Sequence, residues 1–424
     1  MQLDRPREMT SRTAEETAGA SVTGAEGGRY GSALEVLRIF LRLGLTSFGG
    51  PVAHLGYFRA EFVARRRWLD DRVYADLVAL CQFLPGPASS QVGIAIGLSR
   101  AGYAGALAAW TAFTLPSAVA MVLFAYGVGA LGDIAGSGWL HGLKVAAVAV
   151  VAQAVLGMMR SLAPDRERAT LAVAAAALTL AVPSAWGQIG AIVLGGLAGA
   201  ALLRTNVSSD QVALPLNVSR TVGAALLAVF FVLLIGLPLL AASTPSQPVK
   251  LFDAFYRAGS LVFGGGHVVL PLLQASVVPP GWVGNDAFLA GYGAAQAVPG
   301  PLFTFAAYLG AVAKPSPHGV PGAVLGLIGI FLPGILVLLG TLPFWDALRQ
   351  KTGAQAMMRG VNAAVVGLLG AALYNPVWTS SVQAPGDFAV ALVGFVLLTV
   401  WRAPPLVVVI VSAIGGALLA LQDG

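Results

Sequence analysis

Hydrophobic residues gather in long uninterrupted runs along most of this chain, and the pattern predicts helices that cross a membrane. Residues 103–131 and 221–242, for example, contain no Lys, Arg, Asp or Glu. About 20 uncharged apolar residues are enough to cross the hydrocarbon core of a bilayer as a helix. We therefore expect an all-α polytopic membrane protein whose first partner is the lipid bilayer.

The apolar segments form two sets of six that are separated by one further segment. The first set lies at about 33–60, 75–98, 103–130, 139–160, 169–183 and 186–203, the single segment at 221–243, and the second set at about 253–276, 287–312, 320–343, 357–375, 386–401 and 404–421. The extra segment makes the number of elements between equivalent points odd. If all of them cross, the second set enters the bilayer upside down, which is the inverted-topology repeat of many secondary transporters.

Sequence motifs recur in the two sets, in the same order and at nearly constant offsets. LRLGLTSFGGPVAHL (41–55) corresponds to YRAGSLVFGGGHVVL (256–270), and QFLPGPASSQVGIAIG (82–97) corresponds to QAVPGPLFTFAAYLG (296–310). Further along, LPS (115–117) matches LPG (332–334), and HGLKVAAVAV (141–150) matches RGVNAAVVGL (359–368). Ordered matches of this kind indicate two homologous halves.

This repeat predicts the domain organisation. Residues 33–203 form the first repeat, residues 204–250 a connector with one transmembrane helix, and residues 251–424 the second, inverted repeat. Residues 1–32 are rich in Ser, Thr, Gly, Ala and Glu and contain no apolar run that could act as a signal peptide. We expect them to be a disordered tail.

Glycine and proline pairs interrupt the first two segments of each half. Such residues break helices, and a broken helix at membrane depth persists only where protein or a water-filled cavity satisfies its backbone. The loop at 61–72 holds four Arg, whereas its counterpart at 277–286 holds no Lys or Arg. The positive-inside rule places the Arg-rich loop in the cytoplasm only if the interrupted segments are re-entrant. We favour about nine crossings plus four re-entrant hairpins, with thirteen crossings as the alternative.

Composition excludes several classes of function. Charged residues make up 10% of the chain and hydrophobic residues 57%, against roughly 25% charged residues in soluble domains. The single cysteine, Cys81, and the four histidines leave little for a metal centre, an iron–sulfur cluster or a disulfide framework, so we expect no metal and no cofactor. No Walker A motif is present. The net charge is +6, and residues 1–30, with four Arg and five acids, contribute −1 to it. The positive charge therefore belongs to the membrane part of the chain, and we expect no nucleic acid partner.

Charged residues beside the breaks favour an anionic substrate. A broken helix exposes N-terminal N–H groups that attract anions. Arg42 precedes the first break and Arg257 occupies the equivalent position in the second half, while Lys144 lies in an apolar segment and corresponds to Asn362. Intramembrane charges are costly and usually functional. The alternatives are that Arg42 pairs with Glu35 or snorkels, and that Lys144 reaches the interface.

Neutral hydrogen-bond donors surround the breaks and complete the candidate substrate site. Such donors suit an oxyanion, although helix–helix hydrogen bonding explains them equally well. The histidines that follow the breaks are more often packed, hydrogen-bonded residues than ligands. The candidates are the polar residues Gln82, Ser89, Ser90, Gln91, Gln296 and Thr304, the histidines His54 and His267, and the break glycines Gly49, Gly50, Gly86, Gly264, Gly265 and Gly300.

Taken together, SFGGPVAH (47–54), RRWL (66–69), QFLPGP (82–87) and FTLPS (113–117), with their echoes FGGG, QAVPGP and FLPG, resemble the chromate ion transporter family in its long, two-domain form. The resemblance covers about residues 33–421. It implies a carrier in the bacterial inner membrane that expels chromate, driven by the membrane potential or a proton gradient, and confers chromate resistance. It also implies competition from sulfate, which is likewise a tetrahedral dianion.

Three other functions remain as alternatives at this point. The first is uptake or exchange of sulfate or a related oxyanion. The second is an anion channel. The third is a membrane enzyme such as a chromate reductase, which the scarcity of cofactor ligands disfavours, so we do not expect an enzyme. The sequence leaves the oligomeric state open, with a homodimer as one candidate.

Overall fold

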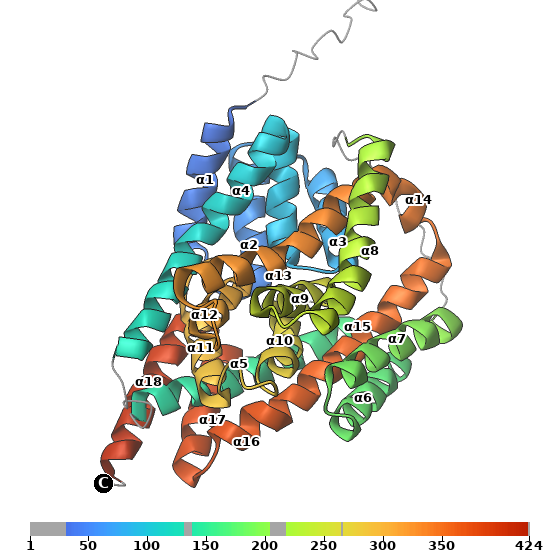
Figure 1. Cartoon of the computed structure of the whole chain (residues 1–424). Coiled ribbons are helices and arrows are strands. Elements are labelled where there is room, and N and C mark those ends of the chain that lie inside the picture. The colour runs from blue at the N-terminus through green and yellow to red at the C-terminus, as the bar shows by residue number, and fades with distance from the viewer. Residues whose placement is uncertain (1–30, 131–137, 204–217, 264–265, 423–424) are drawn as a thin grey trace, which may run out of the picture.

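The computed structural model describes residues 31–130, 138–203, 218–263 and 266–422, and all regular elements in these ranges are helices (Figure 1). The tail predicted for residues 1–32 therefore lies almost wholly outside the described residues. The first half comprises α1 (Ala33–Thr46), α2 (Gly50–Phe58), the π-helical η1 (Arg59–Arg65), α3 (Asp71–Phe83), α4 (Ala88–Ala130), α5 (Gly138–Leu162), α6 (Arg166–Ala181) and α7 (Ala185–Leu202).

The connector forms one helix, and the second half repeats the order of the first. The connecting helix is α8 (Arg220–Ser243). The second half comprises α9 (Gln247–Ser260), η3 (Gly266–Val268), α10 (Val269–Val277), α11 (Asn285–Ala297), η4 (Leu302–Thr304), α12 (Phe305–Val312), α13 (Gly319–Thr341), η5 (Leu342–Phe344), α14 (Trp345–Arg349), α15 (Thr352–Ala372), η6 (Leu373–Trp378), α16 (Thr379–Ser381), α17 (Pro385–Thr399) and α18 (Pro405–Gln422).

The interrupted segments of the first half turn back on themselves. Arg66, which follows η1, lies 3.8 Å from Glu35 at the start of α1, so α1 and α2 form a hairpin. α4 is broken at Ala101 and Gly102, where the backbone leaves helical geometry. The carbonyl of Arg100, just before this break, accepts from the N–H of Gly31 at 2.9 Å. Both hairpins therefore begin and end on the same side of the molecule. We call these ends the feet of the hairpins, and we call the turns at their opposite ends the tips.

The second half has the same hairpins. The N–H of Lys314, after α12, donates to the carbonyl of Trp282 at 2.9 Å, and the Tyr308 hydroxyl on α12 donates to Ala287 at the start of α11. α9 and α10 also pack against one another. In Figure 1 the first-half hairpins lie in the upper part of the molecule and α10 and α11 lie below them, so the two sets of hairpins approach from opposite sides.

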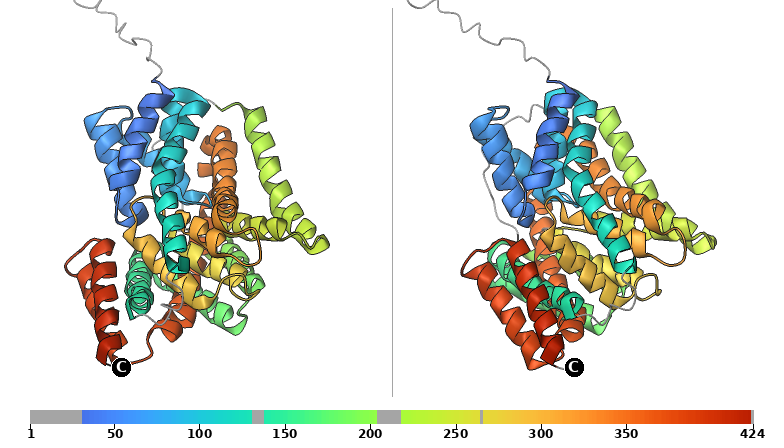
Figure 2. Two further views of the ribbon diagram at one scale, coloured as in Figure 1. Left: turned by 60° about the vertical axis from the view of Figure 1, so that its left-hand side comes forward. Right: turned by 90° about the vertical axis from the view of Figure 1, so that its left-hand side faces the viewer.

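The two halves are interlocked, because each provides partners for the other. α5 packs against α17 and α18 of the second half, and the equivalent helix α15 packs against α6 and α7 of the first. Both views of Figure 2 show the blue N-terminal hairpins at one end of the molecule and the red C-terminal helices at the other. The repeat is therefore also visible in the packing. The long helix of each half, α5 or α15, is covered by helices of the other half.

Close glycine contacts hold this exchanged packing. A Cβ at Gly142 of α5 would meet the backbone of Ser412 and Ala413 on α18, and a Cβ at the equivalent Gly360 of α15 would meet Gly195 on α7. Small residues at helix interfaces let backbones approach closely in membranes. The GLAGAALL stretch at 196–203 contributes to one of these contacts, because Gly199 lies against Gly360.

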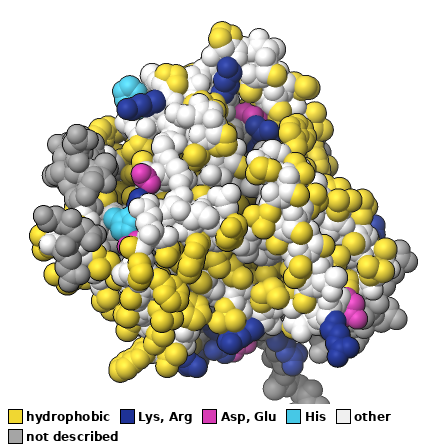
Figure 3. All heavy atoms as spheres, turned by 90° about the horizontal axis from the view of Figure 1, so that it is seen from below, with side chains coloured by type: hydrophobic (Ala, Val, Ile, Leu, Met, Phe, Trp, Pro, Cys, Tyr) yellow, Lys and Arg dark blue, Asp and Glu magenta, His cyan; other side chains and the backbone are white. Residues whose placement is uncertain are grey.

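Exposed side chains of the outer helices are apolar, as expected for a surface that contacts lipid. On α8, Val232, Ile235 and Leu239 are each more than 60% exposed. Figure 3 shows hydrophobic side chains over much of the face seen from below, with few charges among them. Five described helices or helix pairs are long and apolar enough to span a bilayer, and five more apolar helices are shorter. The all-α polytopic membrane fold with two repeats is confirmed, and the count of nine crossings stays a prediction.

The contact between α5 and α18 gives a test of the interlocked packing. We expect Gly142→Ala to lower the melting temperature of the detergent-purified protein by an amount equivalent to about 1–3 kcal/mol, because the added methyl group forces α5 and α18 apart. Gly157→Ala is the matched control on the same helix, since nothing lies within 4 Å of a Cβ there. Equal melting temperatures for the two variants would contradict the packing.

Candidate functional site

The hairpins of the two halves meet at their tips through two backbone hydrogen bonds. The N–H of Gly300 donates to the carbonyl of Ser47 at 2.9 Å, and the N–H of Gly86 donates to the carbonyl of Val262 at 2.8 Å. Ser47 and Val262 are 215 positions apart, and Gly86 and Gly300 are 214 apart. The two bonds are therefore equivalent under the repeat, and we call them the Ser47 junction and the Gly86 junction.

Each tip glycine also lies against a helix of the opposite half. A Cβ at Gly300 would lie 2.8 Å from the Ser117 hydroxyl, and a Cβ at Gly86 would lie 3.0 Å from the Cα of Gly334. Ser117 and Gly334 end the matching LPS and LPG motifs, on α4 and α13. Both tip glycines have positive φ, at 118° for Gly86 and 101° for Gly300, a conformation that other residues adopt rarely. The two PGP motifs thus provide turns that fit into the opposite half.

A buried histidine connects three elements of the Ser47 junction. His54 of α2 is 1% exposed, and its Nε2 lies 3.1 Å from the Ser47 carbonyl, which can only accept. Nε2 therefore carries the proton, which leaves Nδ1 to accept from the Ser89 hydroxyl at 3.4 Å. The Ser47 carbonyl accepts from both His54 and Gly300. His54 thus joins α2, α4 and the first break to the second half.

The Gly86 junction is fastened by a glutamine. The fully buried Gln91 donates from Nε2 to the carbonyl of Pro85 at 2.9 Å and to the carbonyl of Gly334 at 3.0 Å. These two bonds fix the first PGP turn against α13, and they use both donors of the amide. At this junction the side-chain donors are therefore already committed to backbone carbonyls.

Several buried donors of the first half, at the Ser47 junction and along α4, have no hydrogen-bond partner among the described residues. They are the hydroxyls of Ser47, Ser90 and Thr114 and the indole N–H of Trp110. Thr114 lies one turn before Ser117, whose hydroxyl donates to the Thr114 carbonyl at 3.0 Å. A buried donor without an acceptor is costly, and most such groups in folded proteins are paired. These groups can therefore donate to an additional acceptor.

The predicted cationic residues all have carboxylate partners. Arg42 lies 3.1 Å from Glu61, which is 5% exposed, and the Arg42 side chain itself is 56% exposed. Arg257 pairs with Asp253 on the same helix. Lys144 lies 3.0 Å from Asp286, at the foot of the α11–α12 hairpin. None of these pairs takes part in the hydrogen bonds of the two junctions described above, so a direct role of these cations in substrate binding stays a prediction.

The other predicted residues divide between the tips and their surroundings. Thr304 is buried and donates to Pro301 at 2.9 Å, and His267 contacts the hydroxyl of Tyr292 at 2.8 Å. Gly264 and Gly265 lie outside the described residues. The remaining candidates sit at or near the breaks or along α15, with Gln82 and Gly49 exposed and Gly50, Gln296 and Asn362 half-buried.

Comparison with known proteins identifies the family. The sequence profile described as chromate transporter matches residues 34–200 and 249–417, which together are more than half of the chain. The chain belongs to the chromate transporter family. No solved structure matches it.

This chromate transporter family member is similar to some relatives along most of its length and to others along about one half of it. It is 28% identical to a chromate transport protein of Pseudomonas aeruginosa, over 89% of each chain, and 25% identical to a probable chromate transport protein of Synechococcus elongatus, over 91% of this chain and 95% of that one. An uncharacterized transporter, YwrB of Bacillus subtilis, is 32% identical over 180 residues, which cover 87% of that protein but 40% of this chain. That relative is thus about as long as one half.

Sequence reasoning did not single out Ser47, Trp110, Thr114 and Ser117 as site residues. Ser47 belongs to the SFGGP motif, and Thr114 and Ser117 belong to the FTLPS motif. The sequence signal that could have indicated them is the recurrence of LPS (115–117) as LPG (332–334), which marks equivalent positions in the two halves. What the repeat does not reveal is that each of these positions receives the PGP turn of the opposite half.

The fit of Gly300 against Ser117 gives a second test. We expect Gly300→Ala to abolish transport and lower the melting temperature, because the methyl group would separate the second PGP turn from Ser117 and from the Ser47 carbonyl. Gly281→Ala is the control, since Gly281 has a φ of 75° but nothing within 4 Å of a Cβ. Both variants pay about 1–2 kcal/mol for the left-handed backbone, and loss of transport in both would refute a specific role for the junction.

Proposed function

We propose that this protein exports chromate, or a similar tetrahedral oxyanion, across the bacterial inner membrane and thereby confers chromate resistance. The carrier works by alternating access around the two junctions and is driven by the membrane potential or a proton gradient. A sulfate or related oxyanion transporter or exchanger is the alternative, because sulfate has the same charge and shape as chromate.

The unpaired donors at the Ser47 junction and along α4 carry this proposal. A tetrahedral dianion offers four oxygen acceptors, and the hydroxyls of Ser47, Ser90 and Thr114 with the Trp110 indole offer four donors. Neutral donors replace part of the hydration shell of the anion without holding it by a full opposite charge. A carrier needs this compromise, because the substrate must also be released.

The opposed hairpins support alternating access. The first-half hairpins have their feet on one side, the second-half hairpins approach from the other, and the two sets share the two backbone bonds at the tips. Transporters with inverted repeats expose a midplane site to each side in turn when one repeat moves against the other. Opening on one side would then separate tips from the helices of the opposite half while the other side stays closed.

Transport measurements test the substrate and the direction together. We expect cells that express the protein to accumulate less labelled chromate than control cells, and we expect inverted membrane vesicles to take up chromate when energised. Sulfate in excess should slow this uptake. Uptake of sulfate by right-side-out vesicles, with no effect on chromate, would favour the alternative.

Single hydroxyl deletions test the binding site. We expect Ser90→Ala and Thr114→Val each to weaken chromate transport about 10- to 100-fold, because a hydrogen bond to a charged group contributes roughly 1.5–3 kcal/mol. Ser99→Ala is the control, since the Ser99 hydroxyl donates to the carbonyl of Ile96 within its own helix. Wild-type transport by both site variants would remove these donors from the site.

The role of Arg257 can be separated from its ion pair. Arg257→Gln alone would leave the buried Asp253 without its counter-ion, so it could fail for structural reasons. We expect the double variant Asp253→Asn/Arg257→Gln to reach the membrane at wild-type levels and still not transport chromate, measured by export from cells. Export by the double variant at the wild-type rate would show that Arg257 serves only to neutralise Asp253 and has no direct role in transport.

A further inference from the structure

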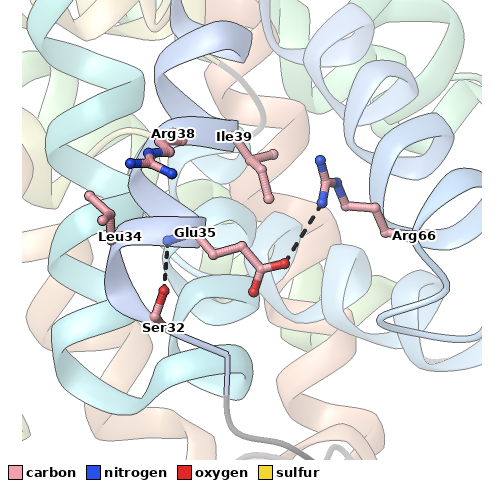
Figure 4. Close-up of a pocket in the computed structure, with 6 residues that line it drawn as sticks. All are labelled: Ser32, Leu34, Glu35, Arg38, Ile39 and Arg66. Atoms are coloured by element: carbon pink, nitrogen blue, oxygen red, sulfur yellow. Dashed lines mark hydrogen bonds and ion pairs between the residues drawn. The ribbon is translucent and has the colours of Figure 1, made fainter.

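We propose that the pocket at the foot of α1 binds the phosphate of an anionic phospholipid. Six residues line this pocket, from α1, its N-cap and the segment after η1: Ser32, Leu34, Glu35, Arg38, Ile39 and Arg66 (Figure 4). Ile39, the lining residue of α1 that is nearest in sequence to Ser47, precedes it by eight positions, so the pocket is separate from the proposed chromate site. The proposal does not depend on which anion is transported.

The pocket is lined by two arginines, Arg38 and Arg66, and by one carboxylate. Glu35 is the one carboxylate that lines it, and it is already engaged by Arg66 at 3.8 Å and by Arg100 at 3.2 Å. In Figure 4 the guanidinium of Arg38 points away from the Glu35–Arg66 pair. No interaction of Arg38 with a described residue is present, so its charge is available to a ligand. The pocket therefore favours an anion.

The repeat explains why Arg38 is left in this position. Its equivalent in the second half is Asp253, which neutralises Arg257 on the same helix. In the first half that acid is replaced by Arg38, and Arg42 pairs with Glu61 on η1 instead. The exchange creates an additional positive charge that no internal ion pair of the first half requires.

The outer face of α1 indicates that the anion belongs to a lipid. Leu34, Leu37, Leu41 and Leu45 are between 37% and 54% exposed and follow one side of the helix, where acyl chains would lie. Leu34 lines the pocket and also begins this apolar stripe. Basic pockets at the cytoplasmic ends of membrane helices bind anionic headgroups in this way. A phospholipid satisfies both the charge and the leucines, whereas a free oxyanion satisfies the charge alone.

Lipid titration of the full-length, detergent-purified protein tests the site. Native mass spectrometry would compare phosphatidylglycerol with phosphatidylcholine of the same acyl chains. We expect tighter binding of phosphatidylglycerol, and we expect Arg38→Gln to weaken that binding about fivefold, as for the loss of one arginine near a headgroup. Arg402→Gln, which removes an exposed arginine beyond the end of α17, should leave it unchanged.

Two results would overturn the proposal. An equal effect of Arg38→Gln and Arg402→Gln would mean that phosphatidylglycerol responds to overall charge and not to this pocket. Full competition of inorganic phosphate with phosphatidylglycerol would assign the pocket to a free oxyanion. The same would follow if inorganic phosphate stabilised the wild type as much as the lipid does and did not stabilise Arg38→Gln. Arg38→Lys, which keeps the charge, should retain most of the preference for the anionic lipid.

Discussion

The need to satisfy backbone groups inside a membrane determines this architecture. Each of the four breaks frees N–H and C=O groups that no lipid can pair, and an unpaired group in hydrocarbon costs several kcal/mol. The protein meets this demand by pairing breaks of one half with breaks of the other, Gly86 with Val262 and Gly300 with Ser47. These bonds join the halves, and the exchanged packing of α5 and α15 joins them further.

The two junctions share a geometry but differ in chemistry. The Ser47 junction contains His54, Ser89, Thr114 and Ser117, whereas the Gly86 junction has Val262 and Gly334 at the positions equivalent to Ser47 and Ser117. At the Gly86 junction Gln91 uses both of its amide hydrogens on backbone carbonyls. The repeat therefore provides two similar supports with different side chains. Such a difference is typical of a duplicated unit whose copies have specialised.

The sequence predicts the hairpins well because their cause is local. Glycine and proline clustered at 47–51, 84–87 and 298–301 interrupt the helices at those positions, and the loop charges favour re-entrant turns over crossings. The pairing between tips is not local, since Ser47 and Gly300 are 253 positions apart and no pattern in either motif identifies its partner. Arg42 illustrates the same limit. Its position beside a break indicates an anion site, yet Glu61, nineteen residues away, neutralises it only because η1 folds back along α1.

The separation of charges from neutral donors is consistent with transport of an anion. The cationic groups Arg65, Arg66 and Arg100 gather near the feet of the first-half hairpins, where Glu35 and Glu61 balance part of their charge. A surplus of positive charge at an entrance raises the local concentration of anions over a distance of about a Debye length. In the low-dielectric interior of a membrane protein, a fixed cation would bind a dianion too strongly for release, because electrostatic attraction grows as the local dielectric falls. Under the proposed function, hydroxyl and indole donors avoid that outcome, because they bind an anion without a full opposite charge and allow its release.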